Sequence, residues 1–171
     1  GRRKPRSPVL RHKLTHPITC DLVHAGRRRR PCRLVARGRF CHAVGPMQLD
    51  EYQKMFEAEE RHFWFRASRT IVERWLLRAM AEAGLDQRAS LVDVGAGTGG
   101  MLSRVSGQAQ CLGIEYSPAG VALSRSRGLR VVRGGLPQLP LATASFDLAL
   151  SMDVFEHVQD DAAAIAEVRR I

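Results

Sequence analysis

Residues 91–100 read LVDVGAGTGG, an apolar run that is interrupted by Asp93 and followed by a glycine-rich turn. The apolar residues on either side of Asp93 predict a buried strand. Gly95, Gly97 and Gly99 allow the backbone to turn sharply and to approach a ligand closely. The segment after the turn can open a helix whose free N–H groups face the same ligand. Strand, turn and helix together predict half of a nucleotide-binding βαβ unit.

The glycine spacing does not by itself identify the nucleotide. Gly95, Gly97 and Gly100 satisfy the G-x-G-x-x-G fingerprint of NAD and FAD proteins, which is a weak signal on its own. Asp93 lies inside the strand, where a carboxylate suits a positively charged ligand such as an ammonium or sulfonium compound. Glu115 ends the next predicted strand and can accept hydrogen bonds from both ribose hydroxyls. Glu115 therefore indicates a nucleoside, and Asp93 indicates a cationic one.

With these residues the chain resembles the class I S-adenosylmethionine-dependent methyltransferases, and among them the broad group that includes the quinone-biosynthesis C- and O-methyltransferases. The resemblance runs from about Met47 to Ile171 and rests on four blocks in family-like order. They are the first motif, the ribose-binding strand end, the approach to the fourth strand and the segment after it: residues 93–99, 113–117, 139–150 and 151–158.

The resemblance implies S-adenosylmethionine as the cofactor and a small molecule as the methyl acceptor. The positions that it implies in cofactor binding are Asp93, Gly95, Ala96, Gly97, Gly99, Glu115, Tyr116 and Asp153. Relatives usually carry an acid in a Gly-Asp pair after the third strand, near the adenine amino group. This chain has Gly134-Gly135 there, so we expect either that backbone groups near Gly135 and Leu136 hold the adenine or that the adenine binds more weakly.

The segment 62–66 and the residue His157 each have a functional and a structural interpretation. Residues 62–66 are the most aromatic segment, and in similar methyltransferases such a segment lies over the cofactor. Trp64 and Phe65 would then close the pocket, and Arg66 would pair with the methionine carboxylate. The alternative is a helix-packing cluster with a surface arginine. His157 is the candidate catalytic base for a hydroxyl acceptor; the alternative is a structural histidine bonded to a neighbouring acid.

The order of apolar segments predicts an α/β fold. We expect helices over 51–60 and 67–83, the second with one apolar face: Ile71, Val72, Trp75, Leu76, Ala79 and Met80. The following segments alternate between strand and helix: strands 90–94, 110–115, 129–133 and 146–151, helices 99–106, 117–127 and 159–170. Right-handed crossovers give an incomplete Rossmann-like, doubly wound parallel sheet in the order 3-2-1-4. Gly95 and Asp153 would meet at the edge where that order reverses.

The positive net charge of the chain, +10, comes from the first 46 residues. Residues 1–46 hold 13 of the 27 basic residues and one of the 17 acidic ones, whereas residues 47–171 carry a net charge of −2. We expect this leader to be disordered, to be a targeting peptide, or not to belong to the native protein. Its cysteine and histidine spacings fit no zinc module, and no metal site is predicted. No apolar run could span a bilayer, so we expect a soluble, cytoplasmic domain.

We expect three parts: the leader 1–46, a helical cap 47–84 and a cofactor-binding half 85–171. Ile171 falls within a predicted helix that, in relatives, leads to three further strands, so we expect a fragment with the fourth strand as an exposed edge. Two other hypotheses stay open here. One is a nicotinamide- or flavin-dependent oxidoreductase with the same glycine pattern, and the other is a non-catalytic protein that binds nucleic acid through the leader.

Overall fold

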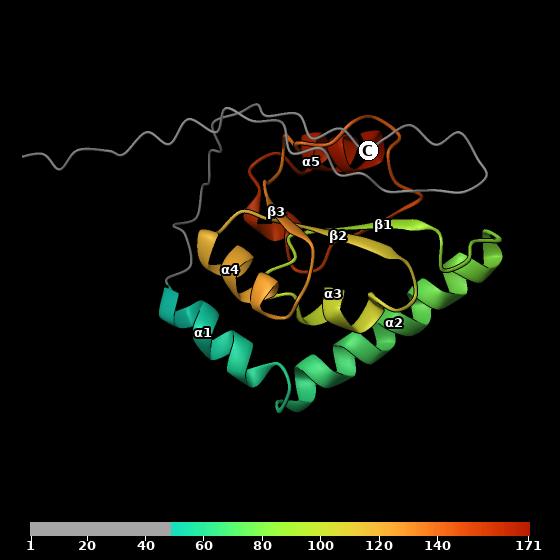
Figure 1. Ribbon diagram of the computed structural model, residues 1–171. Helices are drawn as coiled ribbons and strands as arrows, with labels where there is room; N and C mark the ends of the chain where they lie inside the picture. Colours follow the sequence, from blue (N-terminus) through green and yellow to red (C-terminus); the bar gives the residue numbers. More distant parts are fainter. Residues whose placement is uncertain (1–48) are drawn as a thin grey trace, which may run out of the picture.

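The computed structural model describes residues 49–171, so every expectation about the leader lies outside the described residues. The described part contains one sheet of four parallel strands in the order β3-β2-β1-β4 (Figure 1). These strands are β1 (Ser90–Val94), β2 (Gln110–Glu115), β3 (Val131–Arg133) and β4 (Leu148–Leu150). The predicted strand order is therefore confirmed.

The sheet register brings the carboxyl ends of β1 and β2 to the same edge. Val92 is the partner of Leu112 on one side and of Ala149 of β4 on the other. The bounds of β1 and β2 match the predicted ones, whereas β3 and β4 are only three residues long. Among the described strands, β4 pairs with β1 alone and is an edge.

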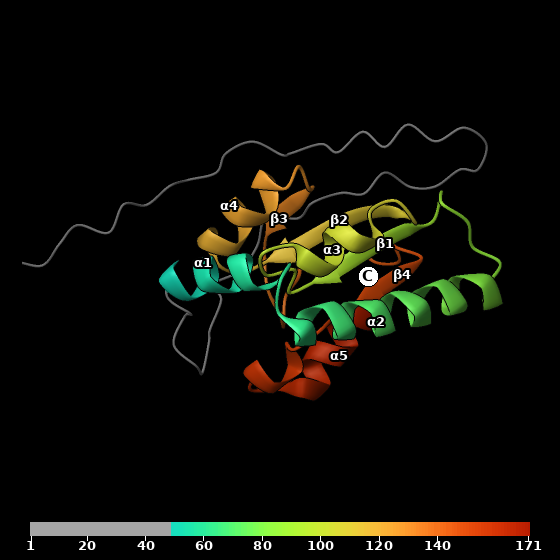
Figure 2. The same cartoon turned by 90° about the horizontal axis from the view of Figure 1, so that it is seen from below.

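Helices cover both faces of the sheet, as Figures 1 and 2 show. One face carries four helices: α1 (Leu49–Ala58), α2 (Phe63–Glu82), α3 (Gly100–Val105) and α4 (Pro118–Ser126). The other face carries α5 (Asp161–Arg170), which follows the short 3-10 helix η1 (Phe155–His157). This is the doubly wound arrangement expected of alternating strands and helices. No helix in the described range is long and apolar enough to cross a bilayer.

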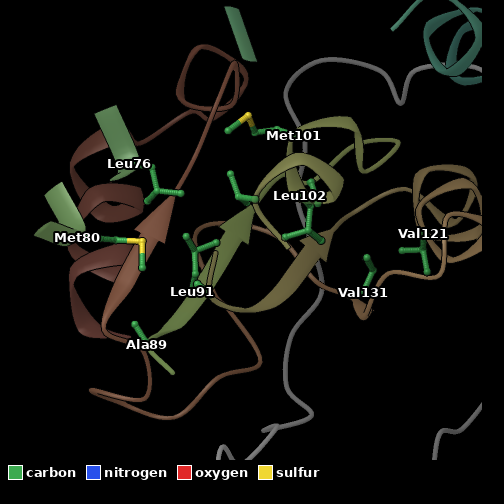
Figure 3. Close-up of a cluster of buried hydrophobic side chains, with 11 residues drawn as sticks. Leu76, Met80, Ala89, Leu91, Met101, Leu102, Val121 and Val131 are labelled. Carbon is green, nitrogen blue, oxygen red and sulfur yellow. The ribbon is translucent and has the colours of Figure 1, made fainter. Parts of the chain in front are cut away.

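The alternation of side chains along β1 divides the apolar core into two clusters. Leu91 faces the helices α2 to α4, where it packs with Leu76, Met80 and Leu102 (Figure 3). The opposite cluster, under α5, contains Val92 and Val94 of β1 with Leu112, Ile114, Ala164 and Ile171. Because successive strand residues point to opposite faces, Asp93 shares the side of Leu91 and the glycine turn follows directly.

The two N-terminal helices differ from the prediction at their starts. α1 begins at Leu49, two residues before the predicted start of the first helix at residue 51. α2 begins at Phe63, because the His62 side chain accepts a hydrogen bond from the backbone N–H of Trp64 at 3.3 Å and caps the helix. The predicted apolar face of α2 is only partly buried: Leu76 and Met80 enter the core, whereas Trp75 is 72% exposed.

Candidate functional site

Glu115 links the end of β2 to the glycine turn after β1. Its carboxylate is buried and accepts hydrogen bonds from the backbone N–H of Gly97 at 2.8 Å and of Ser117 at 2.7 Å. The backbone N–H groups of Gly95 and Ala96 both donate to the carbonyl of Ile114, at 2.8 and 2.9 Å. These four bonds fix the turn against β2 and hold Glu115 beside the glycines, and its role as ribose ligand stays a prediction.

Three glycines of the turn have positive φ angles: Gly95 at 86°, Gly97 at 55° and Gly99 at 83°. Their surroundings differ. A Cβ on Gly95 would overlap the Val154 side chain, and one on Gly99 would lie 2.5 Å from Leu129. A Cβ on Gly97 would meet only the Met55 methyl, at 3.5 Å. Backbone conformation and packing within the protein therefore already require Gly95 and Gly99, a reason that the ligand-based prediction did not include.

Asp93 is a buried carboxylate without a cationic partner. It is 3% exposed, and no basic side chain in the described part of the chain pairs with it. Burial, and after it the negative charge of Glu115, raises the pKa of Asp93 to about 7. An acid in such surroundings favours a positively charged neighbour, which would lower its pKa and stabilise the carboxylate. These residues therefore fit a ligand that carries a cation next to a ribose.

The candidate adenine side lies after β2 and β3. The Tyr116 carbonyl accepts from the Arg133 side chain at 3.2 Å, and the Gly134 N–H donates to the Glu115 carbonyl at 3.0 Å. A Cβ on Gly134 would lie 2.7 Å from Pro140, so this position needs glycine for packing. The Leu136 side chain is buried in the core under α5, and the Gly135 carbonyl accepts from the Gln138 N–H at 3.3 Å. The adenine contact proposed for Gly135 and Leu136 stays a prediction.

The segment after β4 approaches the turn from the other side. Val154 packs against Gly95, and the Ser151 hydroxyl donates to the Val94 carbonyl at 3.0 Å. Asp153 has a φ of 54°, an uncommon conformation for a residue with a side chain, and is exposed. His157 is also exposed, and its backbone N–H donates to the Val154 carbonyl at 2.9 Å. The predicted meeting of the β1 and β4 ends is thus present in the structure.

Comparisons with known proteins agree with this geometry. The sequence model of a methyltransferase domain family matches residues 92–171, which include β1, the glycine turn, Glu115 and the segment after β4. The chain is thus similar, over residues 92–171, to a methyltransferase domain family, and its curated relatives include S-adenosylmethionine-dependent methyltransferases. Their cofactor, S-adenosylmethionine, agrees with the cationic nucleoside indicated by Asp93 and Glu115.

One relative is a probable S-adenosylmethionine-dependent methyltransferase of Mycolicibacterium smegmatis, 33% identical over 115 residues. That alignment covers 66% of this chain and 42% of the relative, so the chain spans less than half of the relative's length. A solved structure of a candidate methyltransferase from Methanococcus maripaludis has a TM-score of 0.62 at 16% identity, and the match covers 75% of this chain and 62% of that one. At this identity the likeness concerns the fold alone.

A third similar protein was solved with the cofactor bound. It is an amino pentose methyltransferase from Micromonospora echinaspora, with a TM-score of 0.53 and 25% identity. The match covers 75% of this chain and 53% of that chain. The comparisons thus support both the methyltransferase fold and the identity of the cofactor.

The helical segment that lies over the glycine turn is not the aromatic segment that the sequence predicted. Residues 62–66 were expected between two helices and over the cofactor, but residues 63–66 form the first turn of α2, where Trp64 is 63% exposed and Arg66 is exposed. Within the N-terminal helical segment, the side chains that lie against Glu115 and the turn come from α1 and from Glu59, just after its end. The hydroxyl of Tyr52 donates to Glu115 at 3.0 Å, and Glu59 lies against Gly100. The pairing of Arg66 with a methionine carboxylate stays a prediction.

Sequence reasoning missed the network that holds α1 in place. Arg127, just after α4, donates to Glu59 at 2.7 Å and to the Thr98 carbonyl of the turn at 3.0 Å. Its guanidinium also lies 4.2 Å from the ring centre of Phe56. The i, i+3, i+7 spacing of Tyr52, Met55 and Glu59 was a visible signal for one helix face. However, a glutamate on that face gave no indication of burial.

Proposed function

We propose that this protein transfers a methyl group from S-adenosylmethionine to a small-molecule acceptor. The observation that carries the proposal is the pair of buried carboxylates at the ends of β1 and β2. Glu115 is positioned by backbone donors beside the glycine turn, and Asp93 lacks a cationic partner among the described side chains. A ligand that satisfies both acids has ribose hydroxyls and a positive charge, and S-adenosylmethionine has both.

In this proposal each part of the site has a binding role. Glu115 accepts hydrogen bonds from the ribose, and Asp93 orients the cationic portion of the cofactor. The backbone of Gly97, which the protein packs less tightly than Gly95 and Gly99, allows the close approach. When bound, the cofactor supplies a methyl group that is already activated by the sulfonium. The protein therefore mainly has to hold donor and acceptor in line.

We further propose that the acceptor binds beside the segment after β4. Asp153 and His157 are exposed there, next to the Val154 side chain that packs against Gly95. His157 could remove a proton from a hydroxyl acceptor, for which an imidazole is suited near neutral pH. The similar amino pentose methyltransferase supports a small molecule as the class of acceptor. A quinone acceptor, implied by the sequence resemblance, is one member of that class.

Isothermal titration calorimetry of the full chain tests the cofactor proposal. S-adenosylmethionine and S-adenosylhomocysteine should bind with a stoichiometry of one, whereas NAD at the same concentrations should give no saturable heat. Binding of NAD in preference to S-adenosylmethionine would instead support the oxidoreductase hypothesis and would contradict the roles given to Asp93 and Glu115.

A further inference from the structure

The acceptor sites of the Glu115 carboxylate are nearly filled by the protein itself. Its Oε1 accepts from the Tyr52 hydroxyl at 3.0 Å and from the Ser117 N–H at 2.7 Å. Its Oε2 accepts from the Gly97 N–H at 2.8 Å. A carboxylate offers about two acceptor sites on each oxygen, so three of the four are used. Two of these donors belong to the backbone beside Glu115, but Tyr52 comes from a separate helix, 63 residues away in the sequence.

This count conflicts with binding of both ribose hydroxyls. Under the function proposed above, on which this inference rests, the two hydroxyls need two acceptor sites on Glu115. Only one remains while Tyr52 is bound. The Ser117 and Gly97 bonds are part of the strand end and the turn, so the Tyr52 hydroxyl is the donor that can leave without rearranging the sheet.

The segment that begins with α1 lies over part of the turn as well as over Glu115. Tyr52 and Met55 of α1, and Glu59 just after its end, lie on one face at a helical spacing. The Met55 methyl lies over Gly97, and the Glu59 carboxylate lies 2.7 Å from the position of a Cβ on Gly100. Tyr52 is 7% exposed and Glu59 is also 7% exposed. The helix thus covers the surface that a nucleoside bound to Glu115 has to reach.

α1 can move away from the turn at a low free-energy cost, because few of its contacts with the rest of the protein are apolar. Tyr52 is the one buried residue of α1, and Leu49 at its start is 70% exposed. After its last turn, the helix is held by Glu59, whose carboxylate pairs with Arg127 at 2.7 Å and with Arg69 at 3.7 Å. Elements held by few buried apolar contacts open at a lower free-energy cost than the core does.

We propose that α1 is a lid in which the Tyr52 hydroxyl occupies, on Glu115, the position of a ribose hydroxyl. In the closed lid Tyr52 satisfies the acid and α1 covers the turn. Cofactor entry exchanges the tyrosine hydroxyl for the ribose hydroxyl, and α1 moves away from Gly97 and Gly100 as it does so. Lids of this kind regulate ligand entry and release in many enzymes.

The Tyr52→Phe variant, which removes only the hydroxyl, tests the proposal. We expect the affinity for S-adenosylhomocysteine to rise about 3- to 10-fold, because the ribose no longer competes with one protein hydrogen bond. The affinity for the 2′-deoxy analogue should change less than twofold, because its single ribose hydroxyl can use the remaining acceptor site. Gln53→Ala, on the exposed side of the same helix, is the matched control and should change neither affinity.

Glu59→Gln provides a second test that leaves Tyr52 in place. Weakening the pair with Arg127 should speed association of S-adenosylhomocysteine in stopped-flow measurements, while circular dichroism confirms that the variant is folded. Lower affinity in Tyr52→Phe would overturn the lid proposal and would make Tyr52 a positioning residue for Glu115. An equal gain for both nucleosides would also overturn it. If the unmodified chain binds neither nucleoside, or if Glu115→Gln binds both normally, the proposed function fails as well.

Discussion

The two sides of the candidate site are built in different ways. On the nucleoside side, Asp93 and Glu115 are buried, and Glu115 and the glycine turn are fixed by backbone hydrogen bonds. On the side after β4, Asp153 and His157 are exposed and lie on a short 3-10 helix and the loop before it. The first side is held by hydrogen bonds between the ends of β1 and β2 and can serve one cofactor. The second is a loop surface, where acceptor preference can vary without disturbing the sheet.

The largest effect is expected at Glu115. Glu115→Gln keeps one oxygen that can accept hydrogen bonds but removes the charge, and it should weaken S-adenosylmethionine binding by roughly 100-fold, or about 2–3 kcal/mol. Titration calorimetry measures the change, and the thermal unfolding midpoint shows whether the turn is intact. An affinity within threefold of the unmodified chain would remove the distinction between the two sides.

Gly95 lies where the two sides of the site meet, against Val154 of the segment after β4. A side chain at this position should disrupt that contact. Gly95→Ala introduces a Cβ at a φ of 86° and overlaps Val154, so it should lower the free energy of unfolding by about 2–4 kcal/mol. Chemical denaturation measures this change. Gly107→Ala is the matched control, because nothing lies within 4 Å of an added Cβ there, and it should cost less than about 0.5 kcal/mol. Equal costs at the two positions would contradict the packing described for the turn.

Asp93 should show opposite effects on stability and on binding. Its pKa of about 7 lies above that of an unfolded aspartate, so stability is highest when it is protonated and falls as the pH rises towards 7. Asp93→Asn removes this penalty and should stabilise the free protein at pH 8, by on the order of 2 kcal/mol, while weakening S-adenosylmethionine binding.

Asp153→Asn is the matched change on the exposed side of the site. It should alter the free energy of unfolding by less than about 0.5 kcal/mol at pH 8. Denaturant melts at pH 5 and pH 8 provide the comparison between the two aspartates. A loss of stability in Asp93→Asn at pH 8 would show that the Asp93 charge already has a partner.

A smaller effect is expected from pH on the affinity for S-adenosylmethionine. A cation beside Asp93 favours the ionised carboxylate, so the affinity for S-adenosylmethionine should rise about 5- to 10-fold between pH 6 and pH 8. S-adenosylhomocysteine lacks the sulfonium charge and should show a smaller rise. Calorimetry at both pH values tests this, and equal pH profiles for the two ligands would place the sulfonium away from Asp93.

The smallest effect is expected at His157. His157→Ala lies on the exposed side, and it should change the affinity for S-adenosylmethionine by less than twofold in the same titrations. A large loss of affinity would mean that η1 takes part in cofactor binding and that the two sides of the site are not separable.

The sequence predictions were accurate where the signal is local and failed where a feature depends on contacts between distant segments. The bounds of β1 and β2 were predicted correctly, because both are largely apolar runs that are followed directly by a turn. The helix predicted over 117–127 likewise starts within one residue of α4, where Ser117 is the N-cap and Pro118 the first helical residue. These signals are local and depend on few neighbours.

The missed features depend on contacts between distant segments. Tyr52 and Arg127 reach the turn from α1 and from the end of α4, and nothing in their local sequence indicates these contacts. The start of α2 was placed four residues late because a histidine cap is a weak signal among aromatic residues. Likewise, periodicity alone predicted Trp75 to be buried, but the part of α2 that faces the sheet is narrower than its apolar surface.

The structure of the full chain bound to S-adenosylmethionine tests the central claim most directly. We predict ribose hydroxyls within hydrogen-bonding distance of Glu115 and the sulfonium on the side of the turn where Asp93 lies, with the Tyr52 hydroxyl moved off Glu115. A nucleoside bound elsewhere, or a complex with NAD whose pyrophosphate fills the turn at Gly95 and Gly97, would contradict the account.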